Sequence, residues 1–312
     1  MTEPSQTASR PDPRPDKVEI VEVGPRDGLQ NHPTLMSTAH KLEFIDRLLD
    51  AGVTRLEAAS FVSPKRVPAM ADSADVMAAV PRGRARYIGL ALNETGVRRA
   101  IEAQCEEINF VLVASPGFGK ANQNATPEES ADALEKIAPI VHEANVFLSA
   151  TVSVAFGDPF DGEVPIAAVA DLAGRAAKAG VQEIALGDTI GVANPWDVAE
   201  RFAAVRAAAP DIALRAHFHN TRNTASANVH AAIEAGIDII DASCGGLGGC
   251  PFAPQATGNA ATEDVVYMLE RAGIDTGIDL AKMIATAKWL EDVLGCESQS
   301  MVSKAGGFPS GA

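Results

Sequence analysis

Two histidines separated by one residue are the first feature with chemical potential. His217 and His219 lie in the run AHFHNT. On a β-strand, side chains two positions apart project from the same face, so both imidazoles can bind one metal ion. A pair of structural histidines, hydrogen-bonded at one end of a sheet, has the same pattern. The metal interpretation therefore needs further ligands from elsewhere in the chain.

Oxygen-bearing side chains occupy comparable positions after other apolar runs. Asp27 follows Arg26 in VEVGPRDGLQ, Glu57 and Asp188 end two further runs, and Asn259 follows the last one. An isolated Arg-Asp-Gly sequence is usually a solvated turn. When several strands place an acid, an amide or a histidine at the same end of a sheet, the set predicts a metal site. Oxygen ligands from Asp27 and Asn259 with the two imidazoles would suit Mg²⁺ or Mn²⁺, and Zn²⁺ stays open.

The most unusual segment is CGGLGGCP, which runs from Cys244 to Pro251. Its glycines resemble a phosphate-binding loop, but the lysine of that motif is absent and no helical pattern follows directly, so nucleotide binding is not favoured. Glycines on both sides of Leu247 give hinge freedom, which favours a flexible lid. Closure of the lid would bring the Cys250 thiol over the site, although a surface loop with an inert thiol has the same pattern. Cys244 is expected to be a packing residue.

Positive charge is sparse in this chain. Its 312 residues include 26 Lys and Arg against 41 Asp and Glu, a net charge of −15. Nucleic acid and anionic membranes attract a basic face, so neither partner is expected. Lys65, Arg66 and Lys120 fall in predicted loops after the second and fourth strands. They are candidates for binding an anionic ligand tail, and an ordinary surface role is equally consistent.

The elements that must position these residues follow from a regular alternation. Short β-branched runs alternate with Ala- and Leu-rich amphipathic stretches, a succession typical of βα units. Eight strands are predicted, at residues 18–23, 53–58, 85–90, 107–113, 146–154, 181–186, 213–218 and 237–242. Helical patterns include residues 39–50, 127–143, 166–179, 195–208, 225–235 and 263–272. Gly52, Gly180 and Gly236 should end three of these helices, because glycine readily takes the left-handed conformation.

This succession predicts a (β/α)8 TIM barrel, with a doubly wound sheet as the alternative. We expect a flexible N-terminal tail at residues 1–17, a barrel domain at 18–275 and a short helical C-terminal extension at 276–312. In a TIM barrel the chemistry lies where strands end and βα loops begin. The candidate residues fall at such positions.

Composition narrows the class of protein further. Hydrophobic residues make up 46% and charged residues 21%, which indicates a globular protein with a sizeable core. The four cysteines lack CxxC spacing, so reduced thiols are expected. The Pro-rich first segment has no apolar centre for a signal peptide, and no apolar run reaches about 18 residues. The sequence therefore predicts a cytoplasmic protein.

Taken together, these segments resemble the 3-hydroxy-3-methylglutaryl-CoA lyases of the metal-dependent barrel lyase and synthase superfamily. The similarity extends over about residues 18–278. Its most specific pieces are VEVGPRDGLQN, EAASFVSPKRVPAMAD, LGDTIGVANP, AHFHNT, GLGGCPFAPQATGNAATEDVVYML and GIDTGIDL. The resemblance implies cleavage of 3-hydroxy-3-methylglutaryl-CoA to acetyl-CoA and acetoacetate, a role in leucine degradation, and a homodimer or larger homo-oligomer.

The resemblance also implies roles for single residues. The four candidate ligands match the family's metal ligands, and Arg26 matches the arginine that stabilises the thioester enolate. Cys250 matches a mobile-loop thiol that shuttles a proton. Glu57 and Asp188 match acids that order the site.

These roles form a consistent chemical sequence. A bound metal would lower the pKa of the C3 hydroxyl of the substrate, so that Asp27 or His217 could remove its proton. Carbon–carbon cleavage would then release an enolate, whose charge needs a fixed cation, Arg26. Cys250 would protonate the enolate carbon.

Departures from the family pattern concern the acyl group. The chain has NTRN at residues 220–223 where Asp-Thr-Tyr-Gly is more frequent, and Pro33 stands where a lysine often follows GLQN. Val154 and Asp158 replace cysteines of the animal enzymes. A lyase for citramalyl-CoA or a longer 3-hydroxy-3-alkylglutaryl-CoA is therefore the main alternative. A condensing synthase is less favoured because synthases usually carry a further C-terminal domain, and a scaffold without catalysis is the third alternative.

Overall fold

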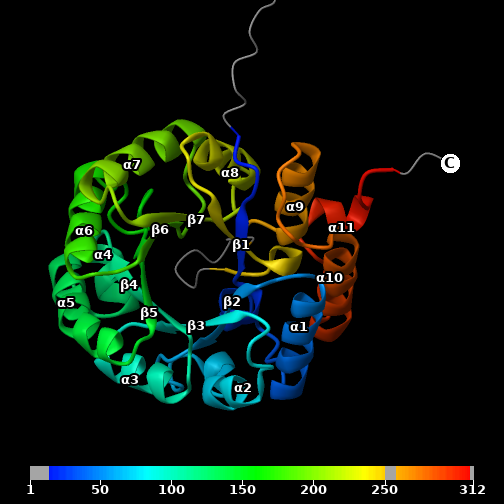
Figure 1. Ribbon diagram of the computed structural model, residues 1–312, viewed down its shortest axis with the longest axis horizontal. Helices are drawn as coiled ribbons and strands as arrows, with labels where there is room; N and C mark the ends of the chain where they lie inside the picture. Colours follow the sequence, from blue (N-terminus) through cyan, green and yellow to red (C-terminus); the bar gives the residue numbers. More distant parts are fainter. Residues whose placement is uncertain (1–13, 250–257, 310–312) are drawn as a thin grey trace, which may run out of the picture.

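Eight parallel strands form a closed barrel in the computed structural model, which describes residues 14–249 and 258–309. In sequence order they are β1 (Glu19–Glu22), β2 (Arg55–Ser60), β3 (Arg86–Ala91), β4 (Glu107–Val113), β5 (Phe147–Ser153), β6 (Glu183–Asp188), β7 (Ala213–Phe218) and β8 (Ile239–Ala242). β8 pairs with β1 and closes the ring (Figure 1). The closure confirms the predicted (β/α)8 barrel and excludes the doubly wound sheet.

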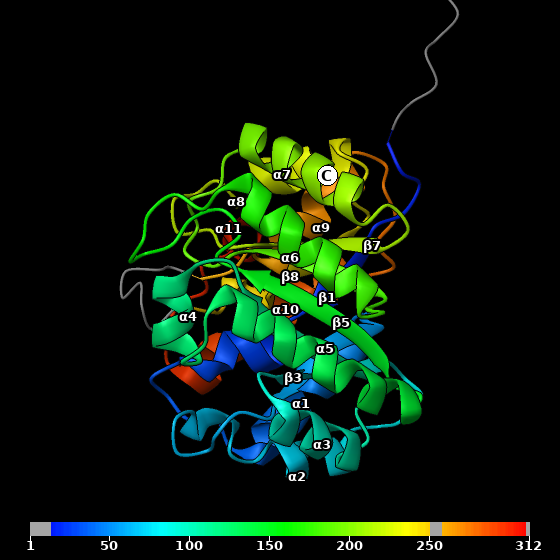
Figure 2. The ribbon, with the colours of Figure 1, turned by 90° about the vertical axis from the view of Figure 1, so that its left-hand side faces the viewer.

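Helices surround the barrel as an outer layer, and Figure 2 shows α5 and α6 lying over the strands from the side. They are α1 (Thr38–Asp50), α2 (Ser73–Ala79), α3 (Glu94–Glu102), α4 (Pro116–Asn122), α5 (Pro127–Glu143), α6 (Ile166–Lys178), α7 (Pro195–Ala208), α8 (Ala225–Glu234) and α9 (Thr262–Arg271). Three short helical turns are η1 (Gly24–Gly28), η2 (Pro68–Met70) and η3 (Cys244–Gly246). After the last βα unit, α10 (Leu280–Leu294) packs beside α1 and α9, and α11 (Met301–Ala305) packs on α9 (Figure 1).

The predicted elements agree closely with the observed ones. β4 and β7 have the predicted bounds, and the other strands begin or end within two residues of the prediction. Gly52, Gly180 and Gly236 have φ of 99°, 87° and 78°, the left-handed conformation expected after a helix. Among the described residues, no helix is both long and apolar enough to cross a membrane.

One boundary was wrong in a way that affects the site. β2 continues to Ser60, so Glu57 lies within the strand and not at its end. The strand continues because its six residues are all buried, as is usual for parallel strands covered on both sides. The pairing of β2 with β3 shifts register between Glu57 and Ala59. Glu57 therefore does not lie at the rim of the barrel. Its side chain extends from within β2 to contact Arg26.

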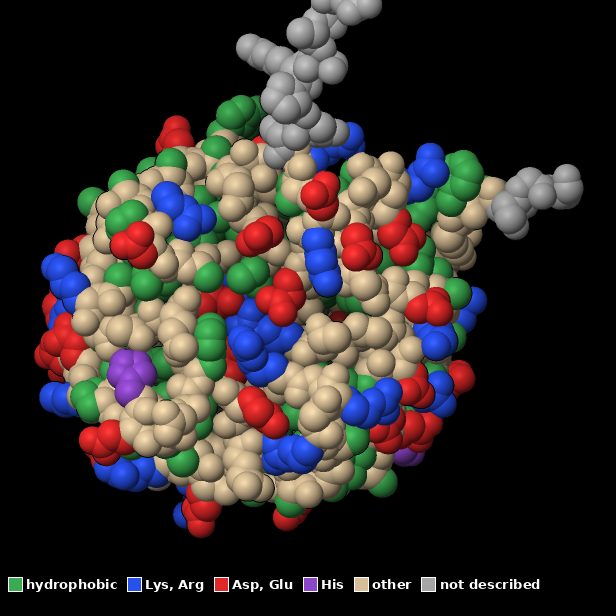
Figure 3. Space-filling view, in the orientation of Figure 1, with side chains coloured by type: hydrophobic (Ala, Val, Ile, Leu, Met, Phe, Trp, Pro, Cys, Tyr) green, Lys and Arg blue, Asp and Glu red, His purple; other side chains and the backbone are tan. Residues whose placement is uncertain are grey.

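Charged side chains fill the barrel interior near the amino ends of the strands. Arg55 donates to Glu107 at 2.7 and 3.0 Å and to Glu183 at 2.8 Å through two nitrogens. Arg215 Nε lies 3.2 Å from Glu183 Oε1. These four side chains are at most 2% exposed. On the face seen in Figure 3, basic and acidic side chains adjoin at the centre of the barrel. The interior there is held by ion pairs that require both partners.

Replacing Arg55 by methionine should lower the free energy of unfolding by about 3–5 kcal/mol, because Glu107 and Glu183 would stay buried without their shared cation. Urea denaturation followed by circular dichroism measures this change. Arg84→Met is the matched control, since Arg84 pairs with Asp50 on the surface at 2.7 Å, and it should have no measurable effect. Equal stabilities of the two variants would contradict the proposed importance of the ion-pair network.

Candidate functional site

A cavity of about 680 Å³ opens at the carboxyl ends of the strands. Its walls come from several βα units, with Arg26 and Asp27 from η1, Asn109 from β4 and His217 from β7. Apolar side chains such as Val111 complete the lining. A cavity of this size, in which polar and charged groups converge among apolar side chains, is typical of a small-molecule site.

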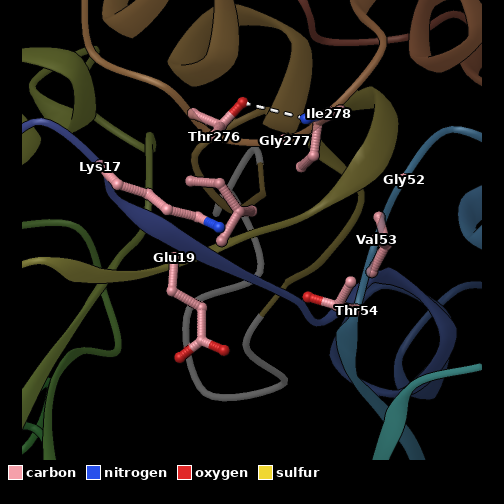
Figure 4. Close-up of a pocket in the computed structure, with 9 residues that line it drawn as sticks. Lys17, Glu19, Gly52, Val53, Thr54, Thr276, Gly277 and Ile278 are labelled. Atoms are coloured by element: carbon pink, nitrogen blue, oxygen red, sulfur yellow. Dashed lines mark hydrogen bonds between the residues drawn. The ribbon is translucent and has the colours of Figure 1, made fainter.

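A second cavity, of about 310 Å³, lies at the amino ends of β1 and β2 (Figure 4). Lys17 and Glu19 line it on one side, and residues 276–278 on another. The carboxyl ends of barrel strands, not the amino ends, carry the catalytic residues of TIM-barrel enzymes. The larger cavity is therefore the candidate active site.

Asp27, His217 and His219 meet at the floor of this cavity. One potential ligand atom of each lies within 4.8 Å of the others. The Nε2 atoms of both histidines are 3.9 Å from Asp27 Oδ2. The turn η1 bends the chain directly after β1, with the Asp27 amide donating to Val23 O at 2.7 Å, and this directs the carboxylate toward β7. The structure thus brings together three of the four predicted metal ligands.

Asn259, the fourth predicted ligand, is paired with His219 through an isolated β-bridge. Its Nδ2 donates to Asp27 Oδ2 at 2.8 Å and to Leu247 O at 3.0 Å. Its Oδ1 is buried and has no hydrogen-bond partner among the described residues. A buried carbonyl oxygen without a donor, beside a carboxylate and two imidazoles, fits a divalent cation.

Charge sets the protonation of these groups. Burial alone would raise the pKa of Asp27, but Arg26 and the two histidines lower it below its usual range, so the carboxylate is ionised. Burial and the neighbouring His217 lower the pKa of His219 to about 4, so its imidazole is neutral near pH 7. Burial lowers the pKa of His217, but the hydrogen bond and charge of Asp241 reverse the effect and raise it. An ionised carboxylate and a neutral imidazole are the forms that bind a metal.

Arg26 lies beside this set and is fixed on two sides. Its Nε donates to Glu57 Oε2 at 2.5 Å, and its Nη1 donates to Asp27 Oδ1 at 2.5 Å. Glu57 in turn accepts from Asn109 Nδ2 at 3.0 Å, and Asn109 Oδ1 accepts from Thr151 at 2.9 Å. A guanidinium held by two carboxylates cannot turn away from the cavity, which suits a fixed positive charge for a developing anion.

Asp188 lies at the end of β6, but its side chain is directed to the following loop and not into the cavity. It ends β6 as predicted, but it accepts from the amides of Val192 at 2.8 Å and Ala193 at 3.1 Å. Its neighbours Gly187 and Thr189 line the cavity, whereas Asp188 is not among the lining residues. Burial raises the pKa of Asp188 to about 6 despite these hydrogen bonds. Asp188 therefore holds the loop between β6 and α7.

The remaining predicted residues lie at the rim or outside the described residues. Arg66 lines the cavity, whereas Lys65 is exposed and does not line it. Lys120 is exposed and donates to Asn124 Oδ1 at 2.6 Å. Cys250 lies outside the described residues. Its neighbour Gly249 lines the cavity.

Three polar residues of the site were missed in the sequence. Asn109 and Thr151 support Glu57, and Asp241 accepts from His217 Nδ1 at 3.0 Å. Asp241 is the single acid in the apolar run IIDA, and Asn109 is the amide in the mostly apolar run EINFVLV. These two polar residues in buried strands were the available signal, whereas Thr151 lies in the hydroxyl-rich run FLSATVS and gave none.

The segment that leads toward Cys250 is anchored by a buried acid. Glu22 accepts from the amides of Gly24 at 2.8 Å and Cys244 at 2.9 Å and from the Thr262 hydroxyl at 2.6 Å. Cys244 itself is fully buried and contacts Glu263, which confirms a packing role. Burial raises the pKa of Glu22 from 4.5 to about 8, so this carboxyl keeps its proton near pH 7.

The pH dependence of stability should reveal this proton. Because the folded state holds the proton that the unfolded state releases, the stabilisation is present below the unfolded pKa of 4.5 and is lost as the pH rises toward about 8. Glu22→Gln removes the titration. The free energy of unfolding of the wild type minus that of the variant should fall by roughly 1.4 kcal/mol per pH unit within this window. Exposed Glu102→Gln should show no such slope, and a flat difference for Glu22→Gln would show that Glu22 is ionised.

Comparisons with known proteins agree on one group of relatives. A family model described as HMGL-like matches residues 17–290. Hydroxymethylglutaryl-CoA lyase of Bacillus subtilis (strain 168) is 42% identical over 284 residues, 91% of this chain and 95% of that protein. (R)-citramalyl-CoA lyase of Chloroflexus aurantiacus is 40% identical over 302 residues, 93% of this chain and 95% of that protein. A solved HMG-CoA lyase from Acinetobacter baumannii, in complex with coenzyme A and 3-methylmalate, superposes with a TM-score of 0.89 at 39% identity over 95% of this chain and 98% of that chain.

Proposed function

Because the chain belongs to the HMGL-like family and is a carbon–carbon lyase, we propose that it cleaves 3-hydroxy-3-methylglutaryl-CoA to acetyl-CoA and acetoacetate with a divalent cation. The observation that carries this proposal is the convergence of Asp27, His217 and His219 beside a clamped arginine, Arg26, in one cavity. Mg²⁺ or Mn²⁺ is the proposed cation, since two of the four candidate ligands are oxygens.

The chemistry requires a metal site and a base. Asp27, His217, His219 and Asn259 would hold the cation. A bound divalent cation supplies Lewis acidity, which lowers the pKa of the C3 hydroxyl. Asp27, which lines the cavity, would take the hydroxyl proton, because coordination through Nε2 leaves His217 without a free lone pair. The bond between C2 and C3 then breaks as the C3 oxygen becomes the ketone of acetoacetate, and the electron pair passes to the thioester fragment as an enolate.

Arg26 would stabilise that enolate, because its guanidinium stays charged and is held in place by Glu57 and Asp27. The enolate carbon must then receive a proton. We propose Cys250 as the donor, from its position after the glycine-rich segment in the sequence. Glu57 and Asp188 are positioning residues in this scheme, the first for Arg26 and the second for the loop after β6.

The phosphates of the CoA moiety need positive charge near the mouth of the cavity. Lys65, Arg66 and Lys120 are the proposed contacts, and Arg66 is the one of these that lines the cavity. Arg66→Ala should raise KM for the acyl-CoA about 3–10-fold with little change in kcat, since a solvent-exposed charge pair contributes about 1 kcal/mol. Steady-state kinetics measure both constants. Lys136→Ala, on α5, is the control, and a lower kcat at unchanged KM for Arg66→Ala would contradict a role in binding.

The second candidate function keeps the same chemistry with citramalyl-CoA as the substrate. The similarity to the (R)-citramalyl-CoA lyase of Chloroflexus aurantiacus favours it. The unusual residue Arg222 donates to the carbonyls of Ile190 and Gly191 at 2.9 Å, so it binds the loop that Asp188 anchors. A sequence change in this loop would alter which acyl group the enzyme binds and would leave the metal ligands in place.

A panel of acyl-CoA thioesters, analysed by HPLC after reaction with the protein, decides between the substrates. We expect acetyl-CoA release from 3-hydroxy-3-methylglutaryl-CoA, with a kcat/KM higher than for citramalyl-CoA or longer 3-alkyl analogues. A higher kcat/KM for citramalyl-CoA would establish the second candidate. Assembly as a homodimer or larger homo-oligomer and a cytoplasmic location stay predictions from the sequence.

A further inference from the structure

His217 has a hydrogen-bonding partner behind it, on the side away from Asp27. Its Nδ1 lies 3.0 Å from Asp241 Oδ2, while its Nε2 faces Asp27 Oδ2 at 3.9 Å. The pairing of β7 with β8 places these residues directly opposite one another in register. The contact is therefore built into the barrel wall and does not depend on a loop.

The protonation of the imidazole follows from this contact. A carboxylate accepts hydrogen bonds, so the neutral ring beside Asp241 carries its proton on Nδ1. Its lone pair is then on Nε2, the atom that faces Asp27 and the cavity. The opposite tautomer would place a hydrogen on Nε2 and could not bind a cation there.

Asp241 is itself held by charges deeper in the barrel. The carboxylate is 5% exposed, and Arg215 Nε lies 3.5 Å from its Oδ1. The same Nε lies 3.2 Å from Glu183, which pairs with Arg55 at 2.8 Å. Asp241 thus connects the ion pairs of the barrel interior to the cavity. The second histidine differs, because His219 Nδ1 is buried without a hydrogen-bond partner in the described part of the chain.

We propose that Asp241, backed by Arg215, is a positioning residue that fixes the proton of His217 on Nδ1 and so directs the Nε2 lone pair to the metal site. This inference rests on the proposed function, because it takes Asp27, His217 and His219 as the ligand set. Carboxylates that hold a ligating histidine in this way commonly change metal affinity by about 10–100-fold.

The tautomer can be measured on the wild-type protein. The sequence has six histidines, so selective ¹⁵N labelling gives few signals, and His217→Asn identifies the one from His217. Two-bond ¹H–¹⁵N spectra of the metal-free protein at about pH 9, where imidazoles are neutral, and of the Mg²⁺-loaded protein should show the proton on Nδ1. A proton on Nε2 of His217 would overturn the proposal, regardless of the metal affinity measured for any variant.

Metal affinity gives the second readout. Asp241→Asn should raise the dissociation constant for Mn²⁺, measured by calorimetry on metal-stripped protein, about 10–100-fold. Asp72→Asn is the matched control. It makes the same substitution at the ion pair of Asp72 with the buried Lys41, away from the metal site. The Mn²⁺ affinity of this variant should equal that of the wild type. An unchanged affinity of Asp241→Asn would overturn the inference alone. A wild type that binds no Mn²⁺ would overturn the proposed metal site as well, and the spectra of the metal-free protein would still decide the tautomer.

Discussion

Arg26→Lys is expected to lower kcat for acetyl-CoA release by about 10²–10³-fold, the loss typical for one donor that stabilises a developing anion. The guanidinium donates to Glu57 and to Asp27 from separate nitrogens at 2.5 Å each. An ammonium is a single point on a flexible chain and cannot keep both contacts while presenting charge to the enolate. Pre-steady-state and steady-state assays of thioester cleavage measure the change.

The controls separate catalysis from folding. Arg98→Lys on α3 makes the same substitution at an exposed i, i+4 ion pair and should retain full activity. Arg26→Lys should keep its Mn²⁺ affinity within a few-fold, since Arg26 is not a proposed ligand. If Arg26→Lys turned over at nearly the wild-type rate, the role of Arg26 in enolate stabilisation would be wrong.

Asp27→Asn is expected to weaken Mn²⁺ binding by more than about 100-fold, beyond the range found for changes behind the ligands. The carboxylate is the one anionic member of the set, and both histidines face its Oδ2 at 3.9 Å. An amide has the same shape but carries no charge, so hard divalent cations bind it less strongly. Calorimetric titration of the metal-stripped variant measures the affinity.

The activity of this variant provides an independent check. Turnover should fall with the metal affinity and recover in part at high Mg²⁺ concentration, which would not occur for Arg26→Lys. Asp50→Asn, which removes the surface partner of Arg84, should bind Mn²⁺ as the wild type does. Unaltered Mn²⁺ affinity in Asp27→Asn would place the metal elsewhere.

The barrel fold could be predicted from the sequence because the same strand and helix patterns repeat along the chain. β-Branched runs mark strands, and Gly52, Gly180 and Gly236 end helices in the left-handed conformation. Strand ends were harder to place, as Glu57 shows. The sequence pattern predicted that the strand ends beside Glu57, but the barrel buries both faces of the following residues and continues the strand to Ser60.

The site was only partly readable for a related reason. Asp27, His217 and His219 stood out because their chemistry and spacing are unusual, and the structure brings them together. Asn109 and Asp241 did not, because each lies within a mostly apolar strand that reads as barrel core. Their partners lie 52 and 24 positions away in sequence, so that only closure of the barrel reveals the contacts.

The site formed by Asp27, His217 and His219 is proposed to cleave 3-hydroxy-3-methylglutaryl-CoA only when it holds a divalent cation. Acetyl-CoA release by chelator-treated protein, measured with and without added Mg²⁺ or Mn²⁺, tests it most directly. We expect no release from the treated protein and full release after either cation is restored. Undiminished cleavage by the chelator-treated protein, or no cleavage with either cation, would contradict it.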